Sequence, residues 1–283
     1  MNPCGGWVPL REGVTYYEQW VGSGDGPWVG LIHGFSVPSF VWRRTAPALA
    51  QAGFRVLSFD LYGRGASGKP RGRYDLDRFV QQALELETAL GVTIDAWVGY
   101  SMGGPIAAEV LARGHGRAGI FIAPVVTGAV LPWTVRITGL PGLGPWLMQH
   151  FGPRRMAQGI RHEFQGRADE DYIQRYIAQL KDPGFLRALA ETVRAGMLGD
   201  QRAVYRRLAA RGVPVAAVWG REDPVVPRDQ LEVLASLLPL RARLLVPGVG
   251  HLVHYERADQ VNAFLVQTLR TWLTEASASG GQA

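Results

Sequence analysis

The sequence contains almost no cysteine. Cys4 is the only one among 283 residues, so an internal disulfide is impossible and the fold cannot depend on an oxidising compartment. A zinc site built from a cysteine cluster is excluded for the same reason. We expect no metal site and no cofactor.

Lysine is also scarce, and basic charge is not concentrated in any segment. Lys69 and Lys181 are the only lysines among 30 basic residues, and the formal net charge is +6. No run of five or more basic residues occurs, which disfavours a nucleic-acid-binding segment. We expect a small-molecule partner and no nucleic acid, and the sequence leaves the oligomeric state open.

Long hydrophobic runs are missing as well. The longest apolar stretch, residues 119–133, contains Pro124 and Pro132 and is shorter than the roughly 20 residues that span a bilayer. The first 13 residues lack the basic start, apolar centre and cleavage site of a signal peptide. We therefore expect no stable membrane insertion and a cytoplasmic location.

What the sequence does contain is a series of short apolar runs, several of which end in Gly or Asp, as buried strands of a parallel sheet do. These runs cover residues 28–34, 54–60, 94–100, 118–124, 213–220 and 242–248. Helical periods lie between most of them, as over residues 76–90 and 105–113. Residues 14–20 alternate and precede a turn-rich link, which is typical of an antiparallel hairpin. The pattern predicts an α/β fold with a mostly parallel sheet flanked by helices.

One stretch of the sequence contains a motif that is typical of a catalytic serine. VGYSMGGP, residues 98–105, places Ser101 between Gly99 and Gly103. The G-x-S-x-G pattern is weak alone, but here it follows a predicted strand and precedes a predicted helix, as a nucleophile elbow requires. Glycines two residues to either side relieve the crowding of that strained turn. We interpret Ser101 as a nucleophile, with a serine in a structural turn as the alternative.

A serine nucleophile needs a base, and the base needs a group that orients it. His251 follows the last predicted strand, where a loop can reach back to Ser101, and His254 is the alternative base. The acidic pair Glu222 and Asp223 follows another predicted strand. We favour Asp223 as the orienting acid, because the strand before it and the proline after it would fix its carboxylate, and we keep Glu222 as the alternative.

Acyl transfer also needs hydrogen-bond donors for the oxyanion that forms in the transition state. The backbone N–H of Met102, directly after Ser101, is one candidate. The N–H of Phe35, in the loop after the strand at residues 28–34, is the other. His33 resembles a second base, but its place beside Gly34 favours a hydrogen bond that organises this loop.

The interval 127–211 separates two predicted strands by more than 80 residues and is helical in pattern. An insertion of that size is usually functional. Its large apolar side chains favour a substrate with an apolar acyl or alcohol group, since ligand pockets are mostly apolar. The residues that we predict to line the pocket are Trp133, Trp146, Met148, Phe164 and Met197.

Five fragments, in this order and at this rough spacing, resemble proteins of the α/β-hydrolase fold over almost the whole chain. They are HGFSVPSFVW, FDLYGRGASGKP, GYSMGG, WGREDPVVP and VPGVGHLVHYE. The resemblance implies a mostly parallel, eight-stranded sheet flanked by helices, with a helical cap inserted between strands six and seven. Residues 1–126 and 212–283 would then form the core, and residues 127–211 the cap.

The resemblance also implies a site and a reaction. The implied roles are nucleophile for Ser101, acid for Asp223, base for His251, and oxyanion donors for Phe35 and Met102. We expect a serine hydrolase that cleaves carboxylic esters with short to medium acyl groups, monoacylglycerol-like esters being one option.

Several alternatives to an ester hydrolase stay open. They are a cofactor-free haloperoxidase or perhydrolase, a carbon–carbon bond hydrolase of ring-fission products, and a non-catalytic ligand binder. Relatives that open epoxides or cleave carbon–halogen bonds use Asp where this chain has Ser101, which argues against both activities.

Overall fold

A computed structural model of the chain describes residues 2–22, 24–140 and 142–279. Its centre is an eight-stranded sheet with the order β1-β2-β4-β3-β5-β6-β7-β8. β2 pairs antiparallel with β1 and β4, and the other neighbouring pairs are parallel. The strands are β1 (Cys4–Leu10), β2 (Gly13–Val21), β3 (Trp28–Ile32), β4 (Arg55–Phe59), β5 (Ala96–Tyr100), β6 (Ala118–Ile122), β7 (Val215–Gly220) and β8 (Leu240–Val246). The mostly parallel sheet predicted from the sequence is confirmed.

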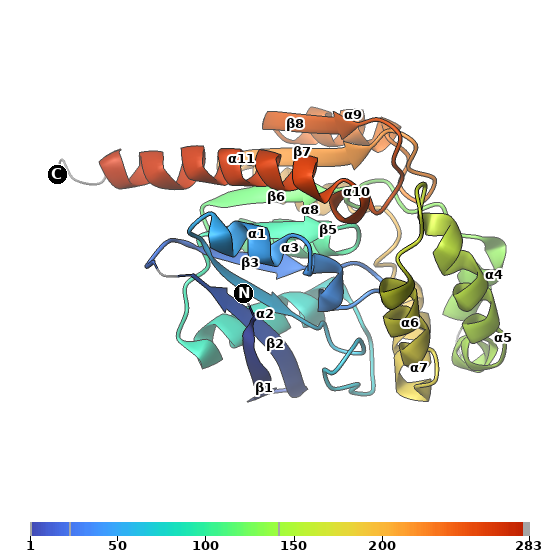
Figure 1. Cartoon of the computed structure of the whole chain (residues 1–283). Helices are drawn as coiled ribbons and strands as arrows, with labels where there is room; N and C mark the ends of the chain where they lie inside the picture. The colour runs from blue at the N-terminus through green and yellow to red at the C-terminus, as the bar shows by residue number, and fades with distance from the viewer. Residues whose placement is uncertain (1, 23, 141, 280–283) are drawn as a thin grey trace.

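Helices cover both faces of this sheet. α1 and α11 contact one another on one face, while α2, α3 and α8 pack together on the other (Figure 1). These core helices are α1 (Ala46–Gln51), α2 (Leu76–Leu90), α3 (Gly103–Ala112), α8 (Arg202–Ala209), α9 (Asp229–Leu237), α10 (Val253–Glu256) and α11 (Ala258–Ser279), with the short 3-10 helix η1 (Ser39–Trp42) after β3. Because helices cover both faces, every residue of β3, β5, β6 and β7 is buried.

A second group of helices lies between β6 and β7 in the chain. It contains α4 (Trp133–Arg136), η2 (Ile137–Gly139), α5 (Leu143–Gly159), η3 (Ile160–Glu163), α6 (Glu170–Gln179) and α7 (Pro183–Arg194). Figure 1 shows α4 to α7 gathered at the edge of the sheet toward which the parallel strands point. The division of the chain at residues 127 and 211 stays a prediction. α8, which lies inside that interval, contacts α3 and α9.

One acidic side chain connects this helical group to the core. Asp169 caps α6 by accepting from the Tyr172 N–H, and its other oxygen accepts from Arg43, Arg44 and the Tyr255 hydroxyl. These hydrogen bonds hold the pKa of Asp169 well below its usual range, although partial burial acts in the opposite direction. The start of α6 is therefore fixed against the residues after η1 and against α10.

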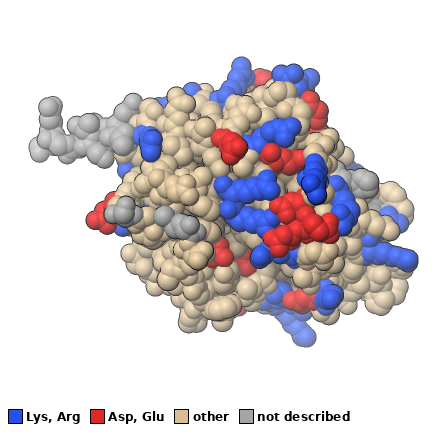
Figure 2. Space-filling model, viewed as in Figure 1, with Lys and Arg blue, Asp and Glu red and all other residues tan. Residues whose placement is uncertain are grey.

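The surface shows no segregation of charge on the face seen in Figure 2, where acidic and basic side chains lie next to each other. In the part of the chain that the structure describes, no helix is both long enough and apolar enough to cross a bilayer.

Candidate active site

Ser101 occupies a strained turn between β5 and α3. Its φ of 53° lies in the left-handed region that side chains other than glycine rarely adopt. The turn is held by hydrogen bonds from the Ser101 N–H to the Ile122 carbonyl and from the Val125 N–H to the Ser101 carbonyl. A serine in such a conformation, at the carboxyl end of a central strand, is the arrangement of a nucleophile elbow.

The glycines around Ser101 are required by close backbone contacts. A Cβ on Gly99 would lie 2.3 Å from the Gly103 carbonyl oxygen, and a Cβ on Gly103 would lie 2.2 Å from the Ile32 carbonyl oxygen. Neither contact can be relieved by moving a side chain, since both partners are backbone atoms. The predicted reason for the two glycines, relief of crowding at the turn, is confirmed.

A chain of hydrogen bonds joins three of the predicted residues. The ring nitrogen Nε2 of His251 lies 2.9 Å from Ser101 Oγ, and Nδ1 lies 2.7 Å from Asp223 Oδ2. The other oxygen of Asp223, Oδ1, accepts from the backbone N–H groups of Val225 and Val226 at 2.8 and 2.9 Å. The carboxylate is therefore fixed from both sides and keeps the imidazole directed at the serine.

The two alternative residues lie outside this chain of hydrogen bonds. Glu222 accepts from the Val249 backbone N–H at 3.1 Å. His254 is fully buried against the rings of Trp42 and Tyr100, and its ring nitrogens have no partner among the described residues. Burial lowers the pKa of His254 to about 3, so this imidazole is a much weaker base than His251.

Two opposing effects set the protonation of His251. Burial lowers its pKa, but the Asp223 carboxylate and, more weakly, Glu163 favour the imidazolium, and the net result is a pKa above the ordinary value of 6.5. The ring of Tyr100 lies 5.0 Å from that of His251 and is neutral, because burial raises the pKa of its hydroxyl well above 10. His251 is thus a stronger base than a free imidazole.

Two backbone N–H groups beside Ser101 have no acceptor among the described residues. They are those of Phe35, in the loop after β3, and Met102, at the N-terminus of α3. His33 organises this loop, as predicted: Nδ1 bonds the Gly34 carbonyl and Nε2 accepts from the Leu61 N–H. Burial lowers the pKa of His33 to about 3, which keeps the imidazole neutral in this role.

A cavity of about 580 Å³ opens beside Ser101. It is lined by Phe35 and His251 and, from the segment between β6 and β7, by residues 129–132 and 158–160, Glu163 and Tyr176. The helices at the carboxyl edge of the sheet therefore form one wall of the site.

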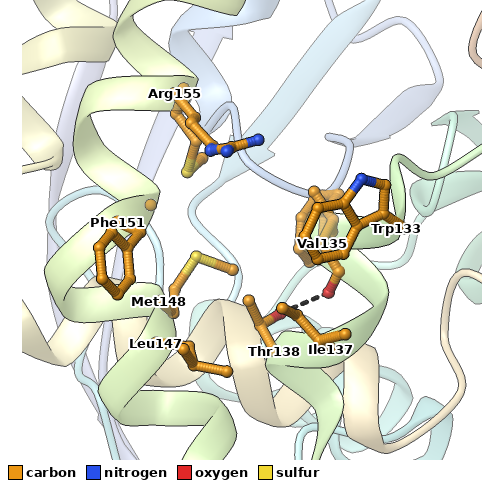
Figure 3. A pocket seen from close by; sticks show the side chains of 11 residues that line it. Trp133, Val135, Ile137, Thr138, Leu147, Met148, Phe151 and Arg155 are labelled. Atoms are coloured by element: carbon orange, nitrogen blue, oxygen red, sulfur yellow. Dashed lines mark hydrogen bonds between the residues drawn. The ribbon is translucent and has the colours of Figure 1, made fainter.

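A second cavity, of about 280 Å³, adjoins the first. The two cavities share the lining residues Phe35, Val135, Arg155 and Met156. Figure 3 shows side chains of α5, including Leu147, facing those of α4 and η2 across this space, with Arg155 at its upper end. Apart from Arg155 and Thr138, the labelled side chains are apolar.

The predicted pocket residues divide into two groups. Trp133 and Met148 line the second cavity. Trp146, Phe164 and Met197 are not among the described residues that line either cavity. Trp146 is exposed and stacks on His150, whereas Phe164 and Met197 are buried in the hydrophobic core.

Sequence reasoning missed Glu163, an acidic residue in the wall of the catalytic cavity. Glu163 is the first acidic residue after Glu109, but its neighbours contain no motif. Only the folded structure shows that Glu163, at the end of η3, lines the same cavity as His251.

The chain matches the family described as "Alpha/beta hydrolase family" over residues 31–264. The fold, the turn at Ser101 and the hydrogen bonds of His251 with Ser101 and Asp223 agree with this match. The chain belongs to this family. A non-heme haloperoxidase of Rhodococcus erythropolis is 29% identical over 94% of this chain and 99% of that protein. A pimeloyl-[acyl-carrier protein] methyl ester esterase of Aliivibrio fischeri (strain MJ11) is 24% identical over 93% and 99% of the two chains.

Solved structures agree on the fold of this alpha/beta hydrolase. A bromoperoxidase from Bacillus anthracis has a TM-score of 0.80 and 21% identity, with 94% of this chain and 100% of that chain covered. The family resemblance predicted from the five sequence fragments is confirmed.

Proposed function

We propose that this alpha/beta hydrolase cleaves carboxylic esters through an acyl-enzyme at Ser101. The observation that carries the proposal is the pair of hydrogen bonds that His251 makes, 2.9 Å to Ser101 Oγ and 2.7 Å to Asp223 Oδ2. They set a hydroxyl, a base and an orienting carboxylate in line at a strained turn, which is the arrangement that activates serine.

In the first half of the reaction, Ser101 Oγ attacks the ester carbonyl carbon while His251 Nε2 takes the hydroxyl proton. The N–H groups of Phe35 and Met102 donate to the oxyanion of the tetrahedral intermediate, each such donor being worth about 3 to 4 kcal/mol of barrier. The intermediate then expels the alcohol oxygen, which receives the proton from His251. The acyl group stays bonded to Ser101.

In the second half, a water molecule attacks the acyl carbon and His251 takes one of its protons. The intermediate collapses, Ser101 Oγ leaves with that proton, and the carboxylic acid departs. Throughout, the Asp223 carboxylate accepts from Nδ1–H, so it fixes the ring tautomer and stabilises the imidazolium.

The adjoining cavity supplies a place for the acyl group. It is mostly apolar and measures about 280 Å³, roughly twice the 150 Å³ that holds a benzene molecule in an engineered protein cavity. An acyl group of medium length fits such a space. In this proposal the helices between β6 and β7 act as the cap, since α4, η2 and α5 form the walls of the cavity.

p-Nitrophenyl esters from acetate to dodecanoate test the reaction class. The wild-type protein should release p-nitrophenol from some of them, and Ser101→Ala should reduce this release to background. A fluorophosphonate probe should label the wild type and not the variant. A folded wild type that hydrolyses no ester and takes no label would refute the proposal.

The similarity to a haloperoxidase over nearly the whole chain favours a second candidate, perhydrolysis. In that reaction hydrogen peroxide replaces water as the nucleophile that attacks the acyl-enzyme, and a peracid is released. Peracid formation from acetic acid or an acetate ester in the presence of hydrogen peroxide would reveal this activity. The rates with peroxide and with water, measured on one substrate, decide between the two.

A further inference from the structure

Glu163 is an ionisable group in the catalytic cavity for which the proposed reaction has no use. It is the last residue of η3 and lines the same cavity as Ser101 and His251. Its carboxylate has no hydrogen bond or ion pair with any residue that the structure describes, and Arg155, which also lines this cavity, does not pair with it. Glu163 is partly buried.

Partial burial makes a carboxylate in this position less favourable than one in bulk water. Transfer of an unpaired polar or charged group out of water is unfavourable, and buried polar groups nearly always have partners. Burial and the negative charge of Asp223 raise the pKa of Glu163 to about 7, although His251 acts in the opposite direction. Since no described residue donates to this carboxyl group, it is available to accept a hydrogen bond from a molecule in the cavity.

The position of Glu163 indicates which part of the substrate meets it. Glu163 lines the same cavity as His251 and favours the imidazolium form of that residue, which protonates the departing alcohol in the proposed reaction. The acyl group, in contrast, occupies the apolar cavity between α5 and α4, whose described lining does not include Glu163. The alcohol part of the ester is therefore the part nearest to Glu163.

We propose that Glu163 determines specificity by accepting a hydrogen bond from a hydroxyl or protonated amine on the alcohol part of the ester. This inference rests on the proposed ester hydrolysis and narrows it to esters of polyols and amino alcohols. A hydroxyl is a donor to either form of the carboxyl group, whereas an ammonium group gains most from the ionised form.

The test compares esters of one acid that differ only in the donor. 2-Hydroxyethyl octanoate is paired with propyl octanoate, and 2-(dimethylamino)ethyl octanoate is paired with 3-methylbutyl octanoate. For the wild type we expect kcat/KM to be about 10- to 100-fold higher for the ester with the donor, the range of a hydrogen bond to a charged group. Release of octanoic acid is the readout.

Two substitutions separate the two donors. Glu163→Leu should abolish both preferences, which are ratios of kcat/KM within each pair of esters at one pH and so cancel any change common to both. Glu163→Gln keeps a hydrogen-bond acceptor and loses the charge, so the hydroxyl preference should survive and the ammonium preference should weaken. Glu170→Gln is the matched control, because Glu170 lies exposed on α6 and pairs with Arg161; both preferences should be retained.

Binding to the Ser101→Ala variant separates this inference from the reaction itself. Calorimetry on that variant should show tighter binding of 2-hydroxyethyl octanoate than of propyl octanoate, and Glu163→Leu added to it should equalise the two. Equal binding in both backgrounds, or equal kcat/KM ratios in wild type and Glu163→Leu, would overturn the role of Glu163 while ester hydrolysis stands. A wild type that cleaves no ester would instead contradict the proposed reaction.

Discussion

Arg64 Nε donates a hydrogen bond to the carbonyl oxygen of Phe35 at 2.9 Å, from a guanidinium group that is fully buried. Its other donors reach the Tyr62 carbonyl and the Thr192 hydroxyl of α7. Burial lowers the pKa of Arg64 to about 9, yet the group stays protonated at neutral pH. The loop that carries the Phe35 N–H is thus held by a buried cation, which also bonds a helix of the segment between β6 and β7.

Arg64→Met should therefore impair catalysis through the position of Phe35. We expect kcat to fall by about 10- to 100-fold, less than the 10² to 10³ lost when an oxyanion donor is removed outright, with a smaller change in KM. Arg78→Met is the matched control, because Arg78 is also mostly buried but pairs with Glu12. It should lower the melting temperature and leave kcat within about threefold. Equal kcat losses in the two variants would contradict a positioning role for Arg64.

The apolar cavity should set the preferred acyl length. Leu147→Trp adds bulk to the wall formed by α5 (Figure 3), so long acyl chains should lose the space they bury. Each buried methylene is worth about 0.8 kcal/mol, and displacing two of them should lower kcat/KM for the octanoate about tenfold relative to the acetate. p-Nitrophenyl esters of increasing length provide the measurement.

Leu143→Trp is the control for that substitution. Leu143 lies one turn earlier on α5 and is half exposed, so its replacement should leave the chain-length profile unchanged. If Leu147→Trp also leaves the profile unchanged, the acyl chain does not occupy this cavity.

The pH dependence of kcat/KM should follow the protonation of the base His251. His251 must be neutral to accept the serine proton, and its pKa is raised above 6.5 because Asp223 and Glu163 outweigh the effect of burial. kcat/KM for a neutral ester should thus fall as the pH drops through a value above 6.5. Glu163→Gln removes a negative charge that favours the imidazolium, so it should move this acid limb to lower pH. Activity undiminished at pH 4 would exclude a histidine base.

The sequence brought together the three residues that the structure joins by hydrogen bonds, but it placed the residues that line the cavities less well. Ser101, His251 and Asp223 each follow a strand of the parallel sheet, and such positions converge at one edge whatever the details of packing. The glycines around Ser101 are equally local, because their backbone contacts allow no side chain.

Side chains between β6 and β7 were less predictable for a physical reason. An apolar residue on a helix satisfies the same pattern whether it faces a cavity, the core or a neighbouring ring, so Trp133 and Phe164 could not be told apart. α5 also begins inside a Pro- and Gly-rich stretch and contains Pro153, residues that normally indicate a loop. β1 was missed for a similar reason: Gly5, Gly6 and Pro9 disfavour a strand, yet an edge strand tolerates them.

The carboxylate of Asp223 has no freedom to turn. Oδ1 accepts two backbone N–H groups, from Val225 and Val226, and Oδ2 faces His251 Nδ1 at 2.7 Å. In Asp223→Asn the amide oxygen must stay on the backbone donors, because the NH2 group would otherwise face two N–H groups. The NH2 group then points at Nδ1 and forces the ring proton onto Nε2. That tautomer cannot accept the Ser101 proton, so kcat should fall by up to about 10⁴.

Glu222→Gln is the matched control for this substitution. Glu222 directly precedes Asp223 and bonds the Val249 N–H rather than His251, and an amide oxygen can accept that same hydrogen bond. Its kcat should stay within about tenfold of the wild type. Steady-state kinetics on a p-nitrophenyl ester, with thermal melts to verify folding, provide the comparison. If Asp223→Asn retained a tenth of the activity, or Glu222→Gln lost as much as Asp223→Asn, then the Asp223 carboxylate would not be what orients His251.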